Sequence, residues 1–143
     1  MNLMVHEVLD KVAQAPTRKE KIELLQRYNT LGLRDILKGS FDDSISFILP
    51  PGRPPFEEDD APAGYTISSL QNQTKKLRYM CKGGPGETLP AVRRERMFIE
   101  ILESIHPGEA ELVILMKDKK LTGKYKGLTK KLVSEAFPKL IVS

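Results

Sequence analysis

The sequence predicts an all-α protein that forms one compact multi-helix domain over residues 1–143. First, apolar residues recur along most of the chain at the i, i+3, i+4, i+7 spacing of a helix with one buried stripe. Second, 143 residues of which 40% are hydrophobic can close one core, and a second independent core is not expected. Third, the one stretch that reads as extended, residues 44–49, has no visible hairpin partner.

Three helices are expected in the first 41 residues. The first covers residues 3–15 and stops at Pro16, which cannot continue a helix. Thr17 and Glu20 fit a capping box that opens the second helix, which runs to about residue 28. A turn at residues 29–32 then leads into a third, short helix. The positions expected to be buried are Val5, Val8, Leu9, Val12, Ile22, Leu25, Tyr28, Leu33, Ile36, Leu37 and Phe41.

A proline-rich loop follows at residues 50–64, PPGRPPFEEDDAPAG. Its five prolines lack an N–H group and fix φ, so neither a helix nor a central strand can pass through it. It also carries four consecutive acids, at residues 57–60. One interpretation makes this tract a mimic of nucleic-acid phosphate or a contact for a partner protein, and the other makes it a solvated connector.

Four further helices are expected after the loop. One begins at Ser68 or Ser69, runs to residue 79 and is ended by the glycines of residues 83–86. The next begins near Pro90, and His106 marks the boundary after it as a capping residue. Residues 110–116 are apolar almost all round and predict the central buried helix, and a last helix starts after residue 127. Positions expected to be buried in these helices are Leu70, Leu77, Met80, Phe98, Ile101, Leu102, Ile105, Leu128, Leu132, Val133 and Ala136.

Several classes of function are not expected from the composition. One cysteine, Cys81, and two separated histidines leave no disulfide and no metal-ligand cluster. Neither the glycines at residues 83–86 nor those near Lys124 supply a P-loop motif, and no paired carboxylates or catalytic triad is visible. No apolar run of about 18 residues predicts a membrane span, and the N-terminus lacks the pattern of a signal peptide. We therefore expect a cytoplasmic protein without catalytic activity, cofactor, membrane contact or small-molecule substrate.

The basic character of the chain belongs to its second half. Residues 1–64 hold 8 Lys and Arg against 11 Asp and Glu, a net charge of −3, while residues 65–143 hold 15 against 8, a net charge of +7. The densest part is residues 117–131, KDKKLTGKYKGLTKK, with seven lysines and one acid. Two glycines there, Gly123 and Gly127, predict a tight turn whose N–H groups can approach a phosphate closely, and the start of the last helix adds free N–H groups. A lysine-rich solvated turn is the alternative.

A second basic group lies near the start of the helix that follows Pro90. Arg93, Arg94 and Arg96 oppose the helix dipole, which favours negative charge at that end. An anion bound by these arginines would explain the arrangement, and a solvated turn partly paired with Glu95 and Glu100 is the alternative.

The order of elements resembles the N-terminal helical DNA-binding domain of ATP-dependent DNA ligases, in particular those of T-even-type bacteriophages. The most specific part is residues 110–141, AELVILMKDKKLTGKYKGLTKKLVSEAFPKLI, which is similar to the closing helix, small-residue turn and final helix of that domain. The resemblance implies that the turn contacts the backbone of a DNA duplex across the minor groove. By position it implicates Gly123, Lys124, Lys126, Gly127, Thr129 and Lys130. The ligase adenylation motif K-x-D-G has no counterpart here, so the resemblance implies no ligation.

Two functions follow as hypotheses. The first is a non-enzymatic protein that binds double-stranded DNA without sequence preference, in bacteriophage DNA metabolism or takeover of the host. The second is an interaction module for a host or phage protein, through the acidic loop or the basic surface. The candidate DNA contacts are Lys119, Lys120, Gly123, Lys124, Lys126, Gly127, Thr129, Lys130 and Lys131 in the turn, and Arg93, Arg94 and Arg96 in the second group.

Overall fold

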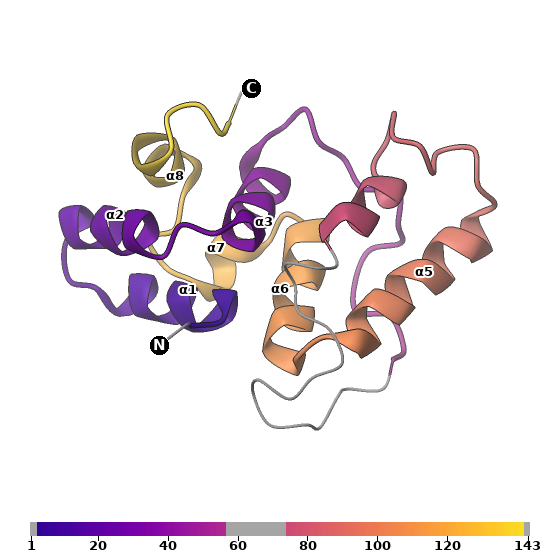
Figure 1. Ribbon diagram of the computed structural model, residues 1–143, viewed down its shortest axis with the longest axis horizontal. Coiled ribbons are helices and arrows are strands. Elements are labelled where there is room, and N and C mark those ends of the chain that lie inside the picture. Colours follow the sequence, from indigo (N-terminus) through magenta and orange to yellow (C-terminus); the bar gives the residue numbers. More distant parts are fainter. Residues whose placement is uncertain (1–2, 57–73, 142–143) are drawn as a thin grey trace.

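The computed structural model describes residues 3–56 and 74–141, and these form an all-helical domain (Figure 1). The helices are α1 (Val5–Gln14), α2 (Arg18–Arg27), α3 (Leu31–Phe41), the 3₁₀ helix η1 (Thr74–Met80), α5 (Ala91–Ser104), α6 (Pro107–Lys117), α7 (Leu121–Lys124) and α8 (Lys130–Ala136). The all-α prediction is confirmed. The acidic tract at residues 57–60, the rest of the loop to residue 64 and the predicted start of the helix at residues 68–73, with Leu70, lie outside the described residues.

Helix α6 is the centre of the fold. It packs against α1, α3, α5 and α7, while α2 packs against α1 and α8. Most of its side chains are buried, from Ala110 to Met116, as the apolar run predicted. In Figure 1, α2 and α8 lie at one end of the long axis and the start of α5 lies at the other.

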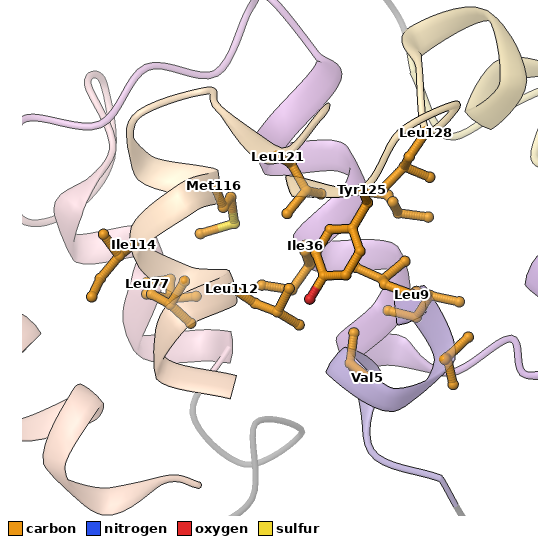
Figure 2. Close-up of a cluster of buried hydrophobic side chains, with 14 of the residues drawn as sticks. Val5, Leu9, Ile36, Leu77, Leu112, Ile114, Met116, Leu121, Tyr125 and Leu128 are labelled. Carbon is orange, nitrogen blue, oxygen red and sulfur yellow. The ribbon is translucent and has the colours of Figure 1, made fainter. Parts of the chain in front are cut away.

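The predicted core positions are confirmed with few exceptions. The four apolar positions of α1 are at most 3% exposed, and Leu25, Leu33, Ile36 and Leu37 are fully buried. Ile22, Tyr28 and Phe41 are only partly buried and cover the edge of the core. Figure 2 shows side chains from α1, α3, α6 and the α7–α8 region meeting in one cluster.

Local signals explain where the first helices begin. Thr17 accepts a hydrogen bond from the Glu20 N–H at 3.2 Å, which satisfies a free donor of the first turn of α2. Thr30 does the same for the N–H of Leu33. Helix α3 therefore begins two residues earlier than predicted, because a threonine cap places Gly32 inside the helix rather than in a turn.

Two predictions for the middle of the chain are corrected. The described part of the helix before residue 80 is a 3₁₀ helix, although Leu77 and Met80 are buried as expected. The extended segment at residues 44–49 also has a partner. Phe47 forms an isolated antiparallel bridge with Cys81, supported by hydrogen bonds from the Ile48 N–H to the Met80 carbonyl and from the Lys82 N–H to the Ser46 carbonyl. A bridge this short has no alternating pattern by which the sequence could have predicted it.

Candidate nucleic-acid interface

The lysine-rich stretch begins where α6 ends, and its first lysines serve the fold. The Lys117 side chain is 2% exposed, and its Nζ donates to the carbonyls of Pro50 at 2.9 Å and Gly52 at 3.0 Å. The carboxylate of Asp118 pairs with Lys117 and accepts the Gly52 N–H at 3.1 Å. Lys117 therefore ties the start of the proline-rich loop to α6, because a buried ammonium must be paired.

Lys119 ends α6 in an unusual backbone conformation. Its φ of 58° lies in the left-handed region, where helices often end but usually with glycine. The N–H groups of Lys119 and Lys120 bond to the carbonyls of Met116 and Leu115, which is the Schellman pattern of helix termination.

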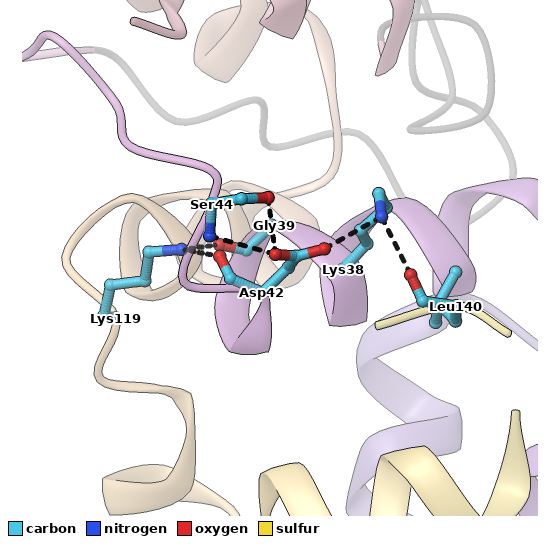
Figure 3. Close-up of polar contacts among 6 residues, drawn as sticks. All are labelled: Lys38, Gly39, Asp42, Ser44, Lys119 and Leu140. Atoms are coloured by element: carbon cyan, nitrogen blue, oxygen red, sulfur yellow. Dashed lines mark hydrogen bonds and ion pairs between the residues drawn. The ribbon is translucent and has the colours of Figure 1, made fainter. Parts of the chain in front are cut away.

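The Lys119 side chain offsets the strain of that conformation. Its Nζ donates to the carbonyls of Gly39 and Asp42, at the C-terminal end of α3 (Figure 3). Burial lowers the pKa of the Lys119 ammonium, an effect opposed by the nearby acids Asp43 and Asp42. Of the predicted DNA contacts, Lys119 is thus committed to internal carbonyls.

The acceptors of Lys119 belong to a polar cluster around Asp42. This carboxylate is fully buried and accepts from Lys38 Nζ at 2.9 Å and from the N–H and hydroxyl of Ser44. Lys38 also donates to the Leu140 carbonyl at 2.8 Å (Figure 3). The cluster therefore fixes the end of α3, the α6–α7 link and the C-terminal segment relative to one another.

The predicted glycine turn is present at residues 125–127, but a short helix with an apolar anchor precedes it. Residues Leu121–Lys124 form α7, and Gly123 lies within it, where a Cβ atom would have no heavy atom within 4 Å. Leu121, Tyr125 and Leu128 are at most 2% exposed. Figure 2 shows the Tyr125 ring pointing into the core beside Ile36. The i, i+4, i+7 spacing of these three residues is the sequence signal for this anchor, and it lies within a stretch that is otherwise rich in lysine.

Gly127 does adopt the conformation that favours glycine, with φ of 84°. Gly127 is exposed, and a Cβ atom at this position would lie 3.0 Å from Cε of Lys21 in α2. Lys21 Nζ donates to the carbonyls of Val12 and Ala13 at the end of α1. Gly127 therefore permits close packing of the turn on Lys21 of α2, and the approach of a phosphate to its backbone stays a prediction.

Thr129 serves as the cap of α8. Its hydroxyl oxygen accepts the Leu132 N–H at 3.2 Å, and Thr122 donates to the Leu128 carbonyl at 2.6 Å. Helix α8 has only seven residues. The free N–H groups expected at the start of the last helix are thus partly used by the cap.

Five lysines of the stretch remain on the surface. Lys130 pairs with Asp43 at 3.0 Å, and Lys124 lies 4.0 Å from Glu111. The other three, Lys120, Lys126 and Lys131, are exposed and have no ion-pair partner among the residues that the structure describes.

Helix α2 adds cations that the sequence did not associate with this stretch. Arg18 pairs with Glu135 of α8 at 2.9 Å, and the charge of Lys131 also acts on that carboxylate, whose pKa the Arg18 hydrogen bond lowers. Lys19, next to Arg18, is exposed. These residues are more than 100 positions from Lys131 in the sequence, so no local pattern could have joined them. We call Lys120, Lys124, Lys126 and Lys131, with Arg18 and Lys19, the basic surface.

The arginines of α5 do not belong to the basic surface. Arg94 is only 9% exposed, and its guanidinium donates to loop carbonyls, among them those of Glu87 at 3.3 Å and Leu89. The prediction of a DNA contact at Arg94 is therefore not supported, because its donors already satisfy carbonyls of the loop before α5. Arg93 and Arg96 are exposed, but the start of α5 lies at the opposite end of the molecule from α8 (Figure 1).

The two histidines meet at another place in the fold. The His6 and His106 rings stack with centroids 4.9 Å apart, and His106 Nδ1 accepts the Gly108 N–H as the cap of α6. The predicted boundary role of His106 is confirmed. The Glu109 carboxylate, 3.3 Å from His6 Nδ1, raises the pKa of His6, with smaller contributions from Glu7 and Asp10.

Two other features are absent from the described part of the chain. No three His, Cys, Asp or Glu side chains in residues 3–56 and 74–141 lie close enough to hold a metal ion. No helix in these two ranges is long and apolar enough to cross a membrane.

Comparison with known proteins shows a family without an assigned function. No curated protein matches the chain, so the resemblance to the ligase DNA-binding domain stays a prediction. A model for a family of unknown function, DUF6433, matches residues 8–123, from α1 into α7. The chain belongs to this family.

Proposed function

We propose that this protein binds double-stranded DNA without sequence preference and without catalysis, and that it holds the phosphate backbone through the basic surface. The observation that carries the proposal is the group of exposed lysines, Lys120, Lys126 and Lys131, that have no acidic partner among the described residues. Lysines of this kind neutralise phosphates and release counterions, and they carry no information about base sequence.

The charge available to a ligand is smaller than the sequence suggested but still substantial. Of the seven lysines in residues 117–131, Lys117 and Lys119 are committed to internal carbonyls, which leaves five on the surface. Lys130 and Lys124 face single acids in pairs of the exposed kind that contribute little and that a phosphate can replace. The four lysines of the basic surface, Lys120, Lys124, Lys126 and Lys131, therefore allow about four phosphate contacts.

The backbone that carries these lysines is held firmly, which favours binding. Leu121, Tyr125 and Leu128 anchor α7 and the turn in the core, and Thr129 caps α8. A preformed backbone loses little conformational entropy when it meets a ligand, so the cost of binding falls mainly on the lysine side chains.

The setting of this function is also part of the proposal. We propose that the protein acts in the cytoplasm, where DNA is accessible, and the resemblance to bacteriophage ligase domains supports a role in phage DNA metabolism. A protein-interaction module of the same fold is the competing function, and it predicts that DNA does not bind.

The proposal is tested by titrating the protein into a fluorescent duplex of about 20 base pairs and measuring anisotropy between about 50 and 200 mM salt. Four phosphate contacts predict that affinity falls about 100-fold over this range. The triple variant Lys120→Ala, Lys126→Ala, Lys131→Ala should lower affinity and reduce the slope of log K against log salt by about 2 to 3. Two duplexes of unrelated sequence should bind equally.

The matched control changes two exposed lysines elsewhere, Lys76→Ala and Lys82→Ala, on η1 and the loop after it. These lysines are not part of the basic surface, so the double variant should bind DNA as the wild type does. Absence of binding at the lowest salt, or equal losses in the triple and control variants, would overturn the proposal.

A further inference from the structure

The residues that the structure describes leave one face of helix α5 uncovered. It packs chiefly on α6 and η1 through Phe98, Ile101 and Leu102. On the opposite face, Val92, Arg96 and Ile99 follow one another at the i, i+4, i+7 spacing of a helix stripe. Val92 is 69% exposed, more than any other large apolar side chain in the described residues. An apolar side chain this exposed gains free energy from any partner that covers it.

A groove runs beside this stripe. It has a volume of about 400 Å³ and lies between α5, at Glu95, Phe98 and Ile99, and the proline-rich segment Leu49–Pro55. The segment is held in place, since Lys117 binds two of its carbonyls and Arg53 pairs with Glu111 at 3.1 Å. The stripe and the groove lie side by side on one surface. In a two-fold symmetric dimer, the stripe of each copy can therefore pack into the groove of the other.

The charges along the exposed face of α5 favour a second copy of this chain as the partner that covers it. The N-terminal half of α5 carries the exposed Arg93 and Arg96 with one acid, Glu95, and the C-terminal half carries Glu100 and Glu103. A second copy in antiparallel orientation places the arginines of each helix beside the glutamates of the other and also opposes the two helix dipoles. A parallel copy would place like charges together. The arginines at the start of α5, which oppose their own helix dipole, then meet carboxylates of the second copy.

We propose that two copies of this chain associate through an antiparallel pairing of their α5 helices, with the Val92–Arg96–Ile99 stripe of each copy seated against the groove of the other. The inference does not rest on DNA binding, since the start of α5 lies at the opposite end of the molecule from α2 and α8, which carry Arg18, Lys19 and Lys131 of the basic surface (Figure 1).

The test uses two charge-reversed variants of the full chain and measures mass by sedimentation equilibrium at low salt, without DNA. Arg93→Glu with Arg96→Glu replaces both arginines of the pairing by acids, and Glu100→Arg with Glu103→Arg replaces both glutamates by bases. The wild type should dimerise, and each variant alone should raise the dimer dissociation constant at least 10-fold because like charges oppose. An equimolar mixture of the two variants should restore a dimer that contains one copy of each.

Circular dichroism checks that each variant keeps its helix content, since Arg93, Arg96 and Glu100 are exposed but Glu103 is half-buried. The control Lys131→Glu, at the other end of the molecule, should leave the dissociation constant unchanged. A wild type that stays monomeric at about 0.5 mM, variants that dimerise as the wild type does, or a mixture that stays monomeric would each overturn the proposal.

Discussion

The buried carboxylate of Glu109 should contribute more to the free energy of unfolding than any surface charge of the protein. It lies in the first turn of α6, is 4% exposed, and accepts the N–H groups of Val5 at 2.9 Å and His6 at 3.0 Å at the start of α1. Each bond to an ionised acceptor contributes about 1.5–3 kcal/mol. Val5 is buried, so its N–H cannot turn to water, whereas part-buried His6 can recover some hydration.

Glu109→Ala should therefore lower the free energy of unfolding by about 3–4 kcal/mol, with the full loss at Val5 and a smaller one at His6. Glu109→Gln keeps one acceptor oxygen but loses the charge that α1 favours at its start, and it should cost about 1–2 kcal/mol. Urea denaturation followed by circular dichroism at neutral pH measures both values.

Glu111→Ala is the matched control. Glu111 lies on the same helix, but it is 37% exposed and pairs at the surface with Arg53 and Lys124, so its loss should cost less than about 1 kcal/mol. The reasoning is refuted if Glu109→Ala destabilises the protein no more than Glu111→Ala does.

Three further predictions rest on other contacts. Because Glu109 raises the pKa of His6, the folded state binds the His6 proton more tightly than the unfolded state does. The stability that this proton contributes is complete below the ordinary histidine pKa and is lost as pH rises through the raised value. Thermal unfolding from about pH 5.5 to 8.5 should show the loss in the wild type and a flatter profile in His6→Gln. Tyr125→Ala should lower the free energy of unfolding by about 3–5 kcal/mol and weaken DNA binding through the turn. Tyr125→Phe should lower it by less than about 1 kcal/mol, because the hydroxyl has no hydrogen-bond partner among the described residues. Equal losses of the two variants in urea denaturation would contradict this. Gly86→Ala should destabilise the folded protein by about 3 kcal/mol or more, because the new Cβ atom would lie 2.1 Å from the Tyr79 carbonyl oxygen. Gly123→Ala, in open space within α7, should stabilise the folded protein by about 0.5–1 kcal/mol without changing its affinity for DNA.

The helices could be predicted because their signals are local. A buried stripe such as that of α1 follows from 3.6 residues per turn, and the predicted cap at Thr17 uses a donor only three residues away. Thr30 is a cap of the same local kind, which the predicted turn at residues 29–32 missed. The glycines at residues 123 and 127 predicted a turn, and the structure has one at residues 125–127. The short helix α7 before it and the burial of Tyr125, which anchors the turn in the core, were not predicted.

The candidate site could be predicted only in part. Lys120, Lys126 and Lys131 are exposed as a lysine-rich stretch suggests. The sequence could not show that Arg93 and Arg96 lie far from them, nor that Arg18 of α2 lies beside α8, since both depend on how distant helices pack (Figure 1).

Most of the helices, their buried faces and the concentration of positive charge in the second half of the chain could thus be read from the sequence, because periodicity, capping and composition act over a few residues. The short helix α7 and the set of cations that a ligand can reach depend on tertiary packing. Lys117 and Lys119 meet carbonyl groups 65 and 80 residues away, and Arg94 is buried against Ile48. A buried cation needs an acceptor wherever the fold brings one, and the residues next to it in the sequence do not reveal that acceptor.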